Sequence, residues 1–347
     1  SSSAQTAYAQ LLEACQSSDL LRSVADLPGS FAAKTVKGRK YWYFQYTEPN
    51  GKLRQLYVGP DTDEVHALIA RKDDAPASGE ALGRPARAAE ALGCEPLERK
   101  HFRVIARLAD YGFFRAGGIL VGTHAFIAYG NMMGVHWEMK GRTEDLDFAH
   151  AGRSLAIALP ENLELNTDHA IRSLDMGFLP IRGLSSQPEA SYLNPREPEF
   201  RLDFVTPMAR EPGPHQHPRL GVSLQPLKYL EYSLEDIRQA VVFHGDRAVL
   251  VNVPAPARYA LHKLLIHRER ADRFRAKINK DLDQAASLLA LLRETSPWAV
   301  LEAWRDLVGR GPAWRSNFQL GLEQLDRRHP EAGFATWFAG FEEQENS

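Results

Sequence analysis

The sequence predicts an α+β protein, and three patterns along the chain lead to this prediction. Near the N-terminus, aromatic and β-branched runs are separated by turn residues, which is typical of a small antiparallel β-meander. In the middle of the chain, short apolar runs alternate with helix-like segments and predict a mixed sheet with flanking helices. Helical patterns dominate residues 254–347, so we expect a helical C-terminal region.

Length and composition limit the class of protein. A chain of 347 residues is long enough for two domains with a small appendage, and its 44% hydrophobic and 25% charged residues are ordinary globular usage. The longest apolar stretches fall far short of the ~20 residues that a membrane-spanning helix needs, and no signal-peptide pattern is visible, so we expect a cytoplasmic protein. The formal net charge of −2 excludes a chain that is basic throughout, so any nucleic-acid surface must be a local patch.

The cysteine and histidine patterns are weak signals. Cys15 and Cys94 cannot build a disulfide framework, and we expect both to be packed thiols. His215 and His217 lie among prolines, where they could bind a metal, but no third ligand follows nearby. Ordinary polar roles are therefore favoured for both.

Residues 1–75 are expected to hold a helical lead-in and then the meander, with strands at 31–36, 40–46 and 53–58. The aromatic second strand is similar to the arm-type DNA-binding sheet of tyrosine recombinases, and its rings could stack on bases. Because side chains alternate between two faces, we also expect about half of these rings to pack inward. The rings are those of Tyr41, Trp42, Tyr43 and Tyr46. Residues 71–93, rich in Ala, Gly, Pro and charge, predict a linker or a loosely packed helical connection, and we assign 76–94 as the linker between domains.

Residues 95–253 are expected to form the main body. The run Ile119-Leu120-Val121 predicts a buried strand, and Gly122-Thr123 predicts a tight turn into a helix with Thr123 as its N-cap. Other strands are predicted at 144–149, 178–184, 200–205, 240–244 and 248–253, and helices at 97–111 and 163–176. In the C-terminal region, 254–347, helices are predicted at 255–270, 273–294, 297–308 and 313–327.

Three aspartates at strand positions form the strongest candidate site. Asp145 and Asp147 lie two residues apart, so on a strand both carboxylates project from one face, about 7 Å apart. Two such charges repel by about 2 kcal/mol at an effective dielectric of 20, and a divalent cation removes that cost. Asp203 adds a third carboxylate between apolar neighbours. Because Mg²⁺ prefers oxygen ligands together with substrate phosphates, we predict that Asp145, Asp147 and Asp203 form a metal site.

The glycine turn is the second element of the candidate site. A strand that ends at Val121 and turns through Gly122 and Thr123 into a helix presents backbone N–H groups and the positive end of the helix dipole. Gly117-Gly118 is a weaker candidate, because a strand rather than a helix follows it. We therefore predict that Gly122 and Thr123 bind the phosphates of a nucleotide.

Together these residues resemble the nucleotidyltransferase (DNA polymerase β-like) superfamily, whose pattern is hG[GS], then Dh[DE]h, then a later h[DE]h. The matching segments are Val121-Gly122-Thr123, Glu144-Asp145-Leu146-Asp147 and Leu202-Asp203-Phe204. The run Leu-Val-Gly-Thr-His-Ala-Phe, the upstream meander, and the downstream His-Lys-Leu-Leu and Lys-Asp-Leu look closest to a bacterial branch that includes proteins similar to AbiEii-type toxins. The resemblance covers roughly residues 95–295.

This resemblance implies a nucleotidyltransferase-type mixed sheet and a transfer of NMP from an NTP to a hydroxyl with release of pyrophosphate. Asp145 and Asp147 are then expected to bridge two Mg²⁺ ions, or Mn²⁺ in their place, and Asp203 to complete the acceptor-side metal. The implied acceptor is RNA or tRNA, a protein or a small molecule, and the sequence does not choose among them.

A basic cluster follows the predicted sheet. Residues 258–280 contain eight Lys or Arg against two acids, a local excess of six, and phosphates are natural partners for such a cluster. The resemblance implies that helical lysines contact the triphosphate, which makes Lys263 and Lys280 nucleotide-binding candidates. A solvated helix face is the competing interpretation.

Two rival functions stay open. A catalytically silent nucleotidyltransferase fold could bind nucleic acid through the meander and the basic cluster, or act as a regulatory module. A recombinase-related DNA-binding protein rests on the meander alone, because the C-terminal half shows no catalytic arrangement of Arg, His and Tyr. Metal-dependent turnover of NTP separates the transferase from both rivals.

Overall fold

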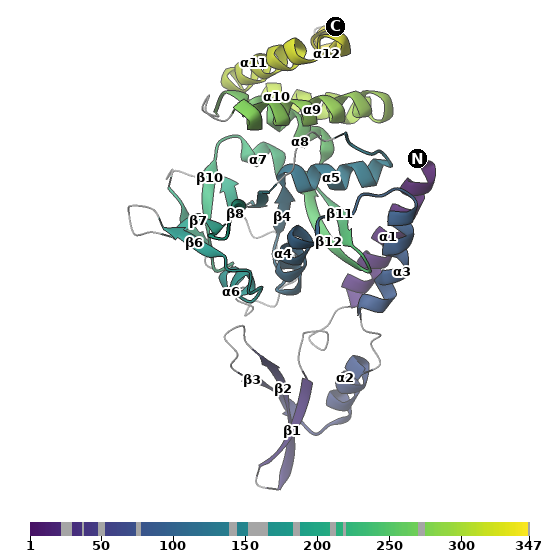
Figure 1. Ribbon diagram of the computed structural model, residues 1–347, viewed down its shortest axis with the longest axis vertical. Helices are drawn as coiled ribbons and strands as arrows, with labels where there is room; N and C mark the ends of the chain where they lie inside the picture. The colour runs from purple at the N-terminus through teal and green to yellow at the C-terminus, as the bar shows by residue number, and fades with distance from the viewer. Residues whose placement is uncertain are drawn as a thin grey trace.

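The computed structural model describes residues 1–21, 30–36, 38–47, 53–73, 78–138, 144–151, 166–182, 188–208, 213–217, 220–269 and 275–345. Figure 1 shows a central body around a mixed sheet, with a helical C-terminal region at one end and a small separate sheet at the other. The α+β prediction is therefore confirmed. None of the helices in these ranges has the length and apolar character that crossing a membrane requires.

The N-terminal meander has the three predicted strands. They are β1 (Ser30–Val36), β2 (Arg39–Thr47) and β3 (Leu53–Pro60), which pair antiparallel in this order. Helix α2 (Asp63–Asp73) follows, and Val65 of α2 and Phe44 of β2 are both buried, Phe44 to 1% exposure. A sheet this small needs such a partner to bury one face.

Helices α1 (Ser2–Leu21) and α3 (Ser78–Ala91) pack on each other and on the body. The segment predicted as a linker, 76–94, is thus mostly a packed helix. The small side chains of Ala86 and Ala89 are fully buried and permit the close approach of α1. Cys15 and Cys94 are both buried thiols in this cluster, as predicted. Residues 22–29, the end of the predicted lead-in, lie outside the described residues.

The central sheet combines parallel and antiparallel strands. Strand β5 is antiparallel to β4 and parallel to β8, and β8 is antiparallel to β7 and parallel to β10. The rings of Phe148 and Phe204 stack across β5 and β8 with centroids 5.2 Å apart, so the core begins at the centre of the sheet. The strands are β4 (Gly118–Val121), β5 (Leu146–His150), β6 (Leu179–Arg182), β7 (Pro188–Asn194), β8 (Glu197–Pro207), β9 (His215–His217) and β10 (Val222–Leu227).

Three of these strands, β7, β9 and β10, were not predicted. Prolines in or beside them make the segments look like loops, because proline cannot donate a ladder hydrogen bond. The helices and hairpin that complete the body are α4 (Arg99–Asp110), α5 (Gly122–Met133), α6 (Thr167–Arg172), α7 (Leu230–Ser233), β11 (Ile237–His244) and β12 (Arg247–Pro254). Helix α6 is shorter than the predicted 163–176, of which 163–165 lie outside the described residues.

The C-terminal region is helical, as predicted, and contains one helix more than expected, α12. Its helices are α8 (Pro256–Leu265), α9 (Arg275–Thr295), α10 (Pro297–Gly309), α11 (Pro312–Arg328) and α12 (Phe334–Glu345).

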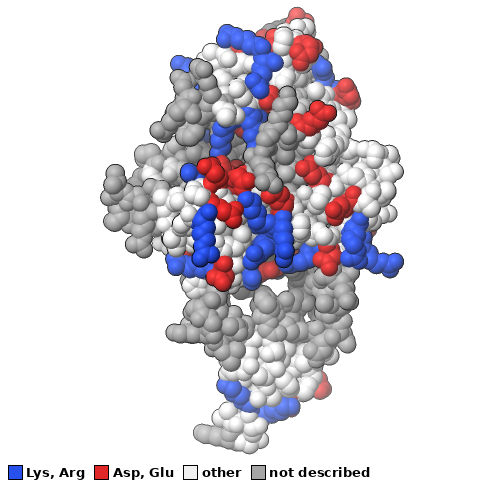
Figure 2. Space-filling view, viewed as in Figure 1, with Lys and Arg blue, Asp and Glu red and all other residues white. Residues whose placement is uncertain are grey.

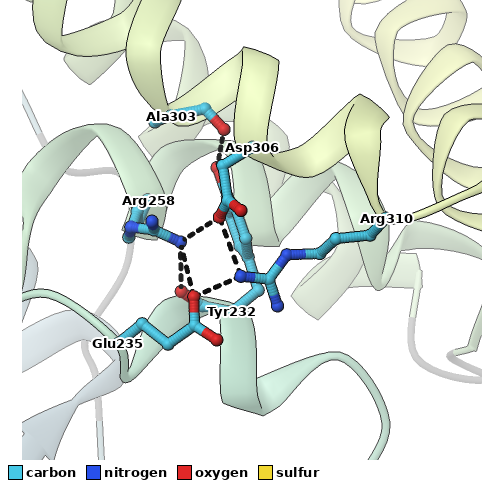
Figure 3. Close-up of polar contacts among 6 residues, drawn as sticks. All are labelled: Tyr232, Glu235, Arg258, Ala303, Asp306 and Arg310. Atoms are coloured by element: carbon cyan, nitrogen blue, oxygen red, sulfur yellow. Dashed lines mark hydrogen bonds and ion pairs between the residues drawn. The ribbon is translucent and has the colours of Figure 1, made fainter.

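An arginine network, defined as Arg258, Arg310, Glu235 and Asp306, connects this region to the body (Figure 3). Arg258 of α8 donates to Asp306 of α10 at 2.7 Å and to Glu235 at 3.2 Å. Arg310 donates to Asp306 at 2.8 Å and pairs with Glu235. Both guanidinium groups also lie near the Tyr232 ring of α7, at 4.8 and 5.2 Å. The network thus joins α7, α8 and α10.

Candidate active site

The central sheet places two of the predicted aspartates side by side. Asp147 on β5 and Asp203 on β8 are partners in the parallel register, and neighbouring strands lie about 4.8 Å apart. Asp145 comes just before β5 begins. The sheet thus joins two segments that are far apart in the sequence, and we call Asp145, Asp147 and Asp203 the carboxylate site.

Asp203 is held by a neighbouring strand. Ser191 lies opposite it on β7, and the Ser191 hydroxyl donates a hydrogen bond to Oδ1 at 2.6 Å. Burial raises the pKa of Asp203 above its ordinary value; the bond from Ser191 lowers it, the negative charge of Asp145 raises it further, and Lys277 opposes that increase. Partial burial near a second carboxylate therefore makes Asp203 a better proton acceptor than an exposed aspartate.

Gly122 fits directly against this site. Its φ of +64° is a left-handed conformation that side-chain-bearing residues adopt only with strain. A Cβ atom at this position would lie 2.1 Å from Oδ2 of Asp147, which is far too close. The glycine lets the turn between β4 and α5 approach the carboxylate, so both its backbone angle and its missing side chain are required.

The prediction that Thr123 is the N-cap of α5 is wrong. The helix begins at Gly122 with Val121 as the N-cap residue, because the glycine turns the chain straight out of β4. The buried Thr123 hydroxyl instead accepts a hydrogen bond from Gln284 Nε2 at 3.3 Å. The Tyr259 hydroxyl lies 2.8 Å from the Gly122 carbonyl oxygen and 3.1 Å from Gln284 Oε1. Helices α8 and α9 thus hold the turn in place.

Sequence reasoning missed Tyr259 and Gln284 as supports of the turn. Both lie more than 130 residues from Gly122 along the chain, and no local pattern connects them. In the sequence, the feature that points to these two residues is their place in or just after the basic cluster, residues 258–280.

The lysines of the basic cluster take different positions. Lys263, on α8, is 6% exposed, and its Nζ lies 2.5 Å from Oδ1 of Asp281. Lys280, on α9, is half-buried; burial lowers its pKa, the charge of Lys263 lowers it further, and the charges of Asp281, Asp145 and Asp147 act in the opposite direction. The charges of Asp145 and Asp147 therefore act on Lys280, which places it near the carboxylate site.

Lys277 was counted in the basic cluster without a specific role. Its Nζ lies 3.0 Å from Oδ2 of Asp145, and both side chains are partly exposed. Lys277 lies one helical turn before Lys280, so the two share a face of α9. That spacing is the signal that would have identified Lys277.

Buried histidines lie beside the turn and at the far edge of the sheet. His124 of α5 contacts His101 of α4 with ring centroids 4.7 Å apart. Burial lowers the pKa of both, so both are neutral at pH 7. His217 packs on His150 at 4.6 Å, and its Nδ1 accepts a hydrogen bond from the Leu220 N–H. The His217 ring thus has a packing role, and His215 is exposed on β9.

The carboxylate site suits Mg²⁺ in its donor chemistry. It offers carboxylate oxygens from two adjacent strands, beside a helix N-terminus that favours phosphates. Across the described ranges, no three His, Cys, Asp or Glu side chains are already grouped closely enough to hold a metal. Mg²⁺ in proteins is usually held by one or two carboxylates together with substrate phosphates.

The fold and the site define a class of protein: a mixed sheet that presents paired carboxylates next to a glycine turn into a helix. A family model described as nucleotidyltransferase matches residues 99–309, well over half of the chain, and the chain belongs to this family. Membership implies an enzyme with an NTP substrate, in a family that is typically metal-dependent. A second model, a domain of unknown function (DUF6788), matches residues 5–67. No curated protein and no solved structure gives a significant match.

Proposed function

We propose that this protein is a magnesium-dependent nucleotidyltransferase that moves an NMP from an NTP to an acceptor hydroxyl and releases pyrophosphate. The observation that carries the proposal is the in-register pair of Asp147 and Asp203, with Gly122 packed against Asp147. The AbiEii-like branch of the superfamily stays a resemblance, and it is compatible with RNA, protein or small-molecule acceptors.

The roles of the residues follow from their positions. Asp145, Asp147 and Asp203 would hold the Mg²⁺ ions, which when bound neutralise the phosphates and activate the acceptor hydroxyl. The backbone of Gly122 and Thr123 faces the phosphates at the N-terminus of α5, and Lys280 lies beside the same site. Lys263, the other nucleotide-binding candidate, is buried and pairs with Asp281.

The chemical step exchanges one phosphoester bond for another. The acceptor oxygen forms a bond to the α-phosphorus, and the bond from that phosphorus to the oxygen bridging to the β-phosphate breaks. Pyrophosphate carries away the electron pair of the broken bond, and Asp203 takes the proton of the acceptor hydroxyl.

The test uses four labelled NTPs, each incubated with the protein, Mg²⁺ and total cellular RNA or protein. We expect label from at least one NTP to appear on a macromolecule, to require Mg²⁺ and to disappear with Asp147→Asn. Label that is equally abundant with Asp147→Asn would contradict the proposal.

One observation favours the silent alternative. In the structure, the Lys277 ammonium pairs with Asp145, where a metal-binding carboxylate is expected to meet a cation. A silent fold would bind NTP without Mg²⁺-dependent turnover, and Lys277→Gln would not restore turnover. If Lys277 instead releases Asp145 when Mg²⁺ binds, the wild-type protein turns over NTP and needs no substitution at Lys277.

A further inference from the structure

The meander has two faces of different chemistry. On one face, Phe44 contacts Phe31 with ring centroids 5.3 Å apart and is almost fully buried. Trp42, on the same face, donates to Asp61 at 2.6 Å and lies against His66 of α2 with centroids 5.7 Å apart. Helix α2 therefore covers this face. The alternation of side chains predicted such inward packing for about half of the aromatic rings of β2.

The opposite face carries three clustered tyrosines that no element covers within the described residues. Tyr43 pairs with Tyr57 across β2 and β3, and their rings lie 5.6 Å apart. Tyr41 lies 6.2 Å from Tyr57, whose side chain is exposed by 58%. We call Tyr41, Tyr43, Tyr57 and Lys34 the tyrosine face.

Lys34 gives this face a positive charge. It lies on β1 opposite Tyr41, its Nζ is 5.0 Å from the centre of the Tyr43 ring, and it contacts the Gln55 amide. The sequences of β1, β2 and β3 contain four Lys or Arg and no Asp or Glu. Of these four, Lys34 and Arg39 belong to the tyrosine face by register, whereas Lys40 and Arg54 belong to the opposite face. The tyrosine face therefore offers aromatic rings with two cations, and the amides of Gln45 and Gln55 pair beside them.

Basic residues also gather on the body. Figure 2 shows Lys and Arg side chains in a band across the part of the body nearest the meander, and more of them on the meander itself. Exposed arginines occur around the start of α4: Arg247 lies 5.9 Å from the Phe102 ring, and Arg103 donates to the Leu174 carbonyl next to α6. A polyanion bound to the tyrosine face would meet a second positive surface there.

We propose that the tyrosine face binds single-stranded RNA, the acceptor of the transferase. That the bound RNA is the acceptor rests on the proposed function, whereas RNA binding by the tyrosine face does not. Single strands expose bases that stack on tyrosine rings, while lysines pair with the phosphates. The paired glutamine amides can hydrogen-bond 2′-hydroxyls, which favours RNA over DNA.

The test measures binding of a labelled 12-nucleotide single-stranded RNA by fluorescence anisotropy. Tyr43→Ala/Tyr57→Ala should weaken binding about 10-fold or more, since stacking on one ring is typically worth about that factor. Tyr43→Phe/Tyr57→Phe keeps the rings and should stay within about threefold of wild type. Lys34→Gln should reduce the slope of log affinity against log salt by about one.

Controls separate this proposal from others. Trp298→Ala removes a 67% exposed ring on α10 and should leave RNA binding unchanged. Tyr57→Ala alone serves if the double variant does not fold, because that ring is largely exposed. All these variants should bind Mg²⁺–NTP normally, and Asp147→Asn should bind RNA normally, so failure of the transferase does not affect this test. Wild-type affinity in both alanine variants, or equal affinity for the matching single-stranded DNA, would overturn the proposal.

Discussion

The carboxylate site and the arginine network both bring charged side chains together where several elements meet. They differ in how positive and negative charges are matched. In the network, two arginines share two carboxylates, and the bonds run between three helical elements. In the carboxylate site, three aspartates lie close to one another, Lys277 pairs with Asp145, and Lys280 lies nearby.

This difference separates stabilising charges from functional ones. A balanced, partly buried network gains stability from its own hydrogen bonds. Neighbouring carboxylates instead repel one another: burial is the main cause of the raised pKa of Asp203, and the charge of Asp145 raises that pKa further. A protein keeps such a cluster where a cationic ligand compensates for it, so substitutions at the two places should have opposite consequences.

The largest expected effect is on activity at the carboxylate site. Asp147→Asn should reduce Mg²⁺-dependent transfer by about 1,000-fold or more, because it removes a carboxylate that the metal needs. The same substitution relieves repulsion, so the thermal midpoint should be unchanged or higher. Transfer assays and thermal melting measure the two results. A variant that keeps near wild-type transfer would remove Asp147 from the site.

Gly122→Ala should have the next largest effect. The added Cβ must displace the Asp147 carboxylate, and alanine at a φ of +64° costs about 1 to 2 kcal/mol. We expect a lower thermal midpoint and at least a 10-fold loss of transfer.

The matched control for Gly122 is Gly245→Ala in the turn between β11 and β12. Gly245 has nearly the same φ, +60°, but nothing lies within 4 Å of an added Cβ. It should show the backbone cost alone and keep transfer. Equal losses of transfer in both variants would mean that the contact with Asp147 has no role.

Lys280 and Lys263 test the nucleotide side of the site. A charge-assisted contact is worth about 1.5 to 3 kcal/mol, so Lys280→Gln should weaken Mg²⁺–NTP binding about 10-fold to 150-fold. Lys263→Gln should mainly lower stability, because it leaves Asp281 without its buried ammonium partner. Calorimetric titration and thermal melting distinguish the two. If Lys263→Gln loses NTP affinity while its thermal midpoint is unchanged, the two roles are reversed and Lys263 is the nucleotide-binding lysine.

The smallest expected effect concerns the network. Asp306→Asn should lower the free energy of unfolding by about 1 to 3 kcal/mol at pH 7, while Mg²⁺–NTP affinity stays the same. Burial by itself raises the pKa of Asp306, but hydrogen bonds from Arg310 and Arg258 outweigh it and hold the pKa below its ordinary value. Its stabilising contribution is thus present above the unfolded pKa and is lost as the pH falls through the folded pKa.

The pH dependence supplies the control for Asp306. Wild-type stability should fall more steeply than that of Asp306→Asn below about pH 4, the ordinary pKa of aspartate. Denaturant unfolding at several pH values measures the difference. Parallel pH profiles would show that Asp306 is not part of the acid-sensitive interactions.

Local patterns determined much of this protein. The strands of the meander follow from alternating aromatic and β-branched residues and their turns, and the order strand, glycine turn, helix at residues 118–133 was predicted with an error of two residues in the helix start. The spacing of Asp145 and Asp147 was also sufficient to suggest a site, because side chains two apart on a strand share a face. Proline-containing strands were missed, since their composition resembles loops, and for the alanine-rich helix α3 the sequence left a linker and a helical connection as alternatives.

Only the tertiary structure decided which distant residues meet. Asp203 lies beside Asp147 because β5 and β8 pair in parallel, and a register shift of one residue would turn Asp203 to the other face of the sheet. The lysines of the basic cluster could not be ranked from sequence, because helix packing decides which side of α8 and α9 faces the site. Packing buries Lys263 against Asp281, brings Lys277 to Asp145, and sets Tyr259 and Gln284 behind the glycine turn. Sequence spacing fixes neighbours along one element, whereas contacts between elements depend on how their faces are buried.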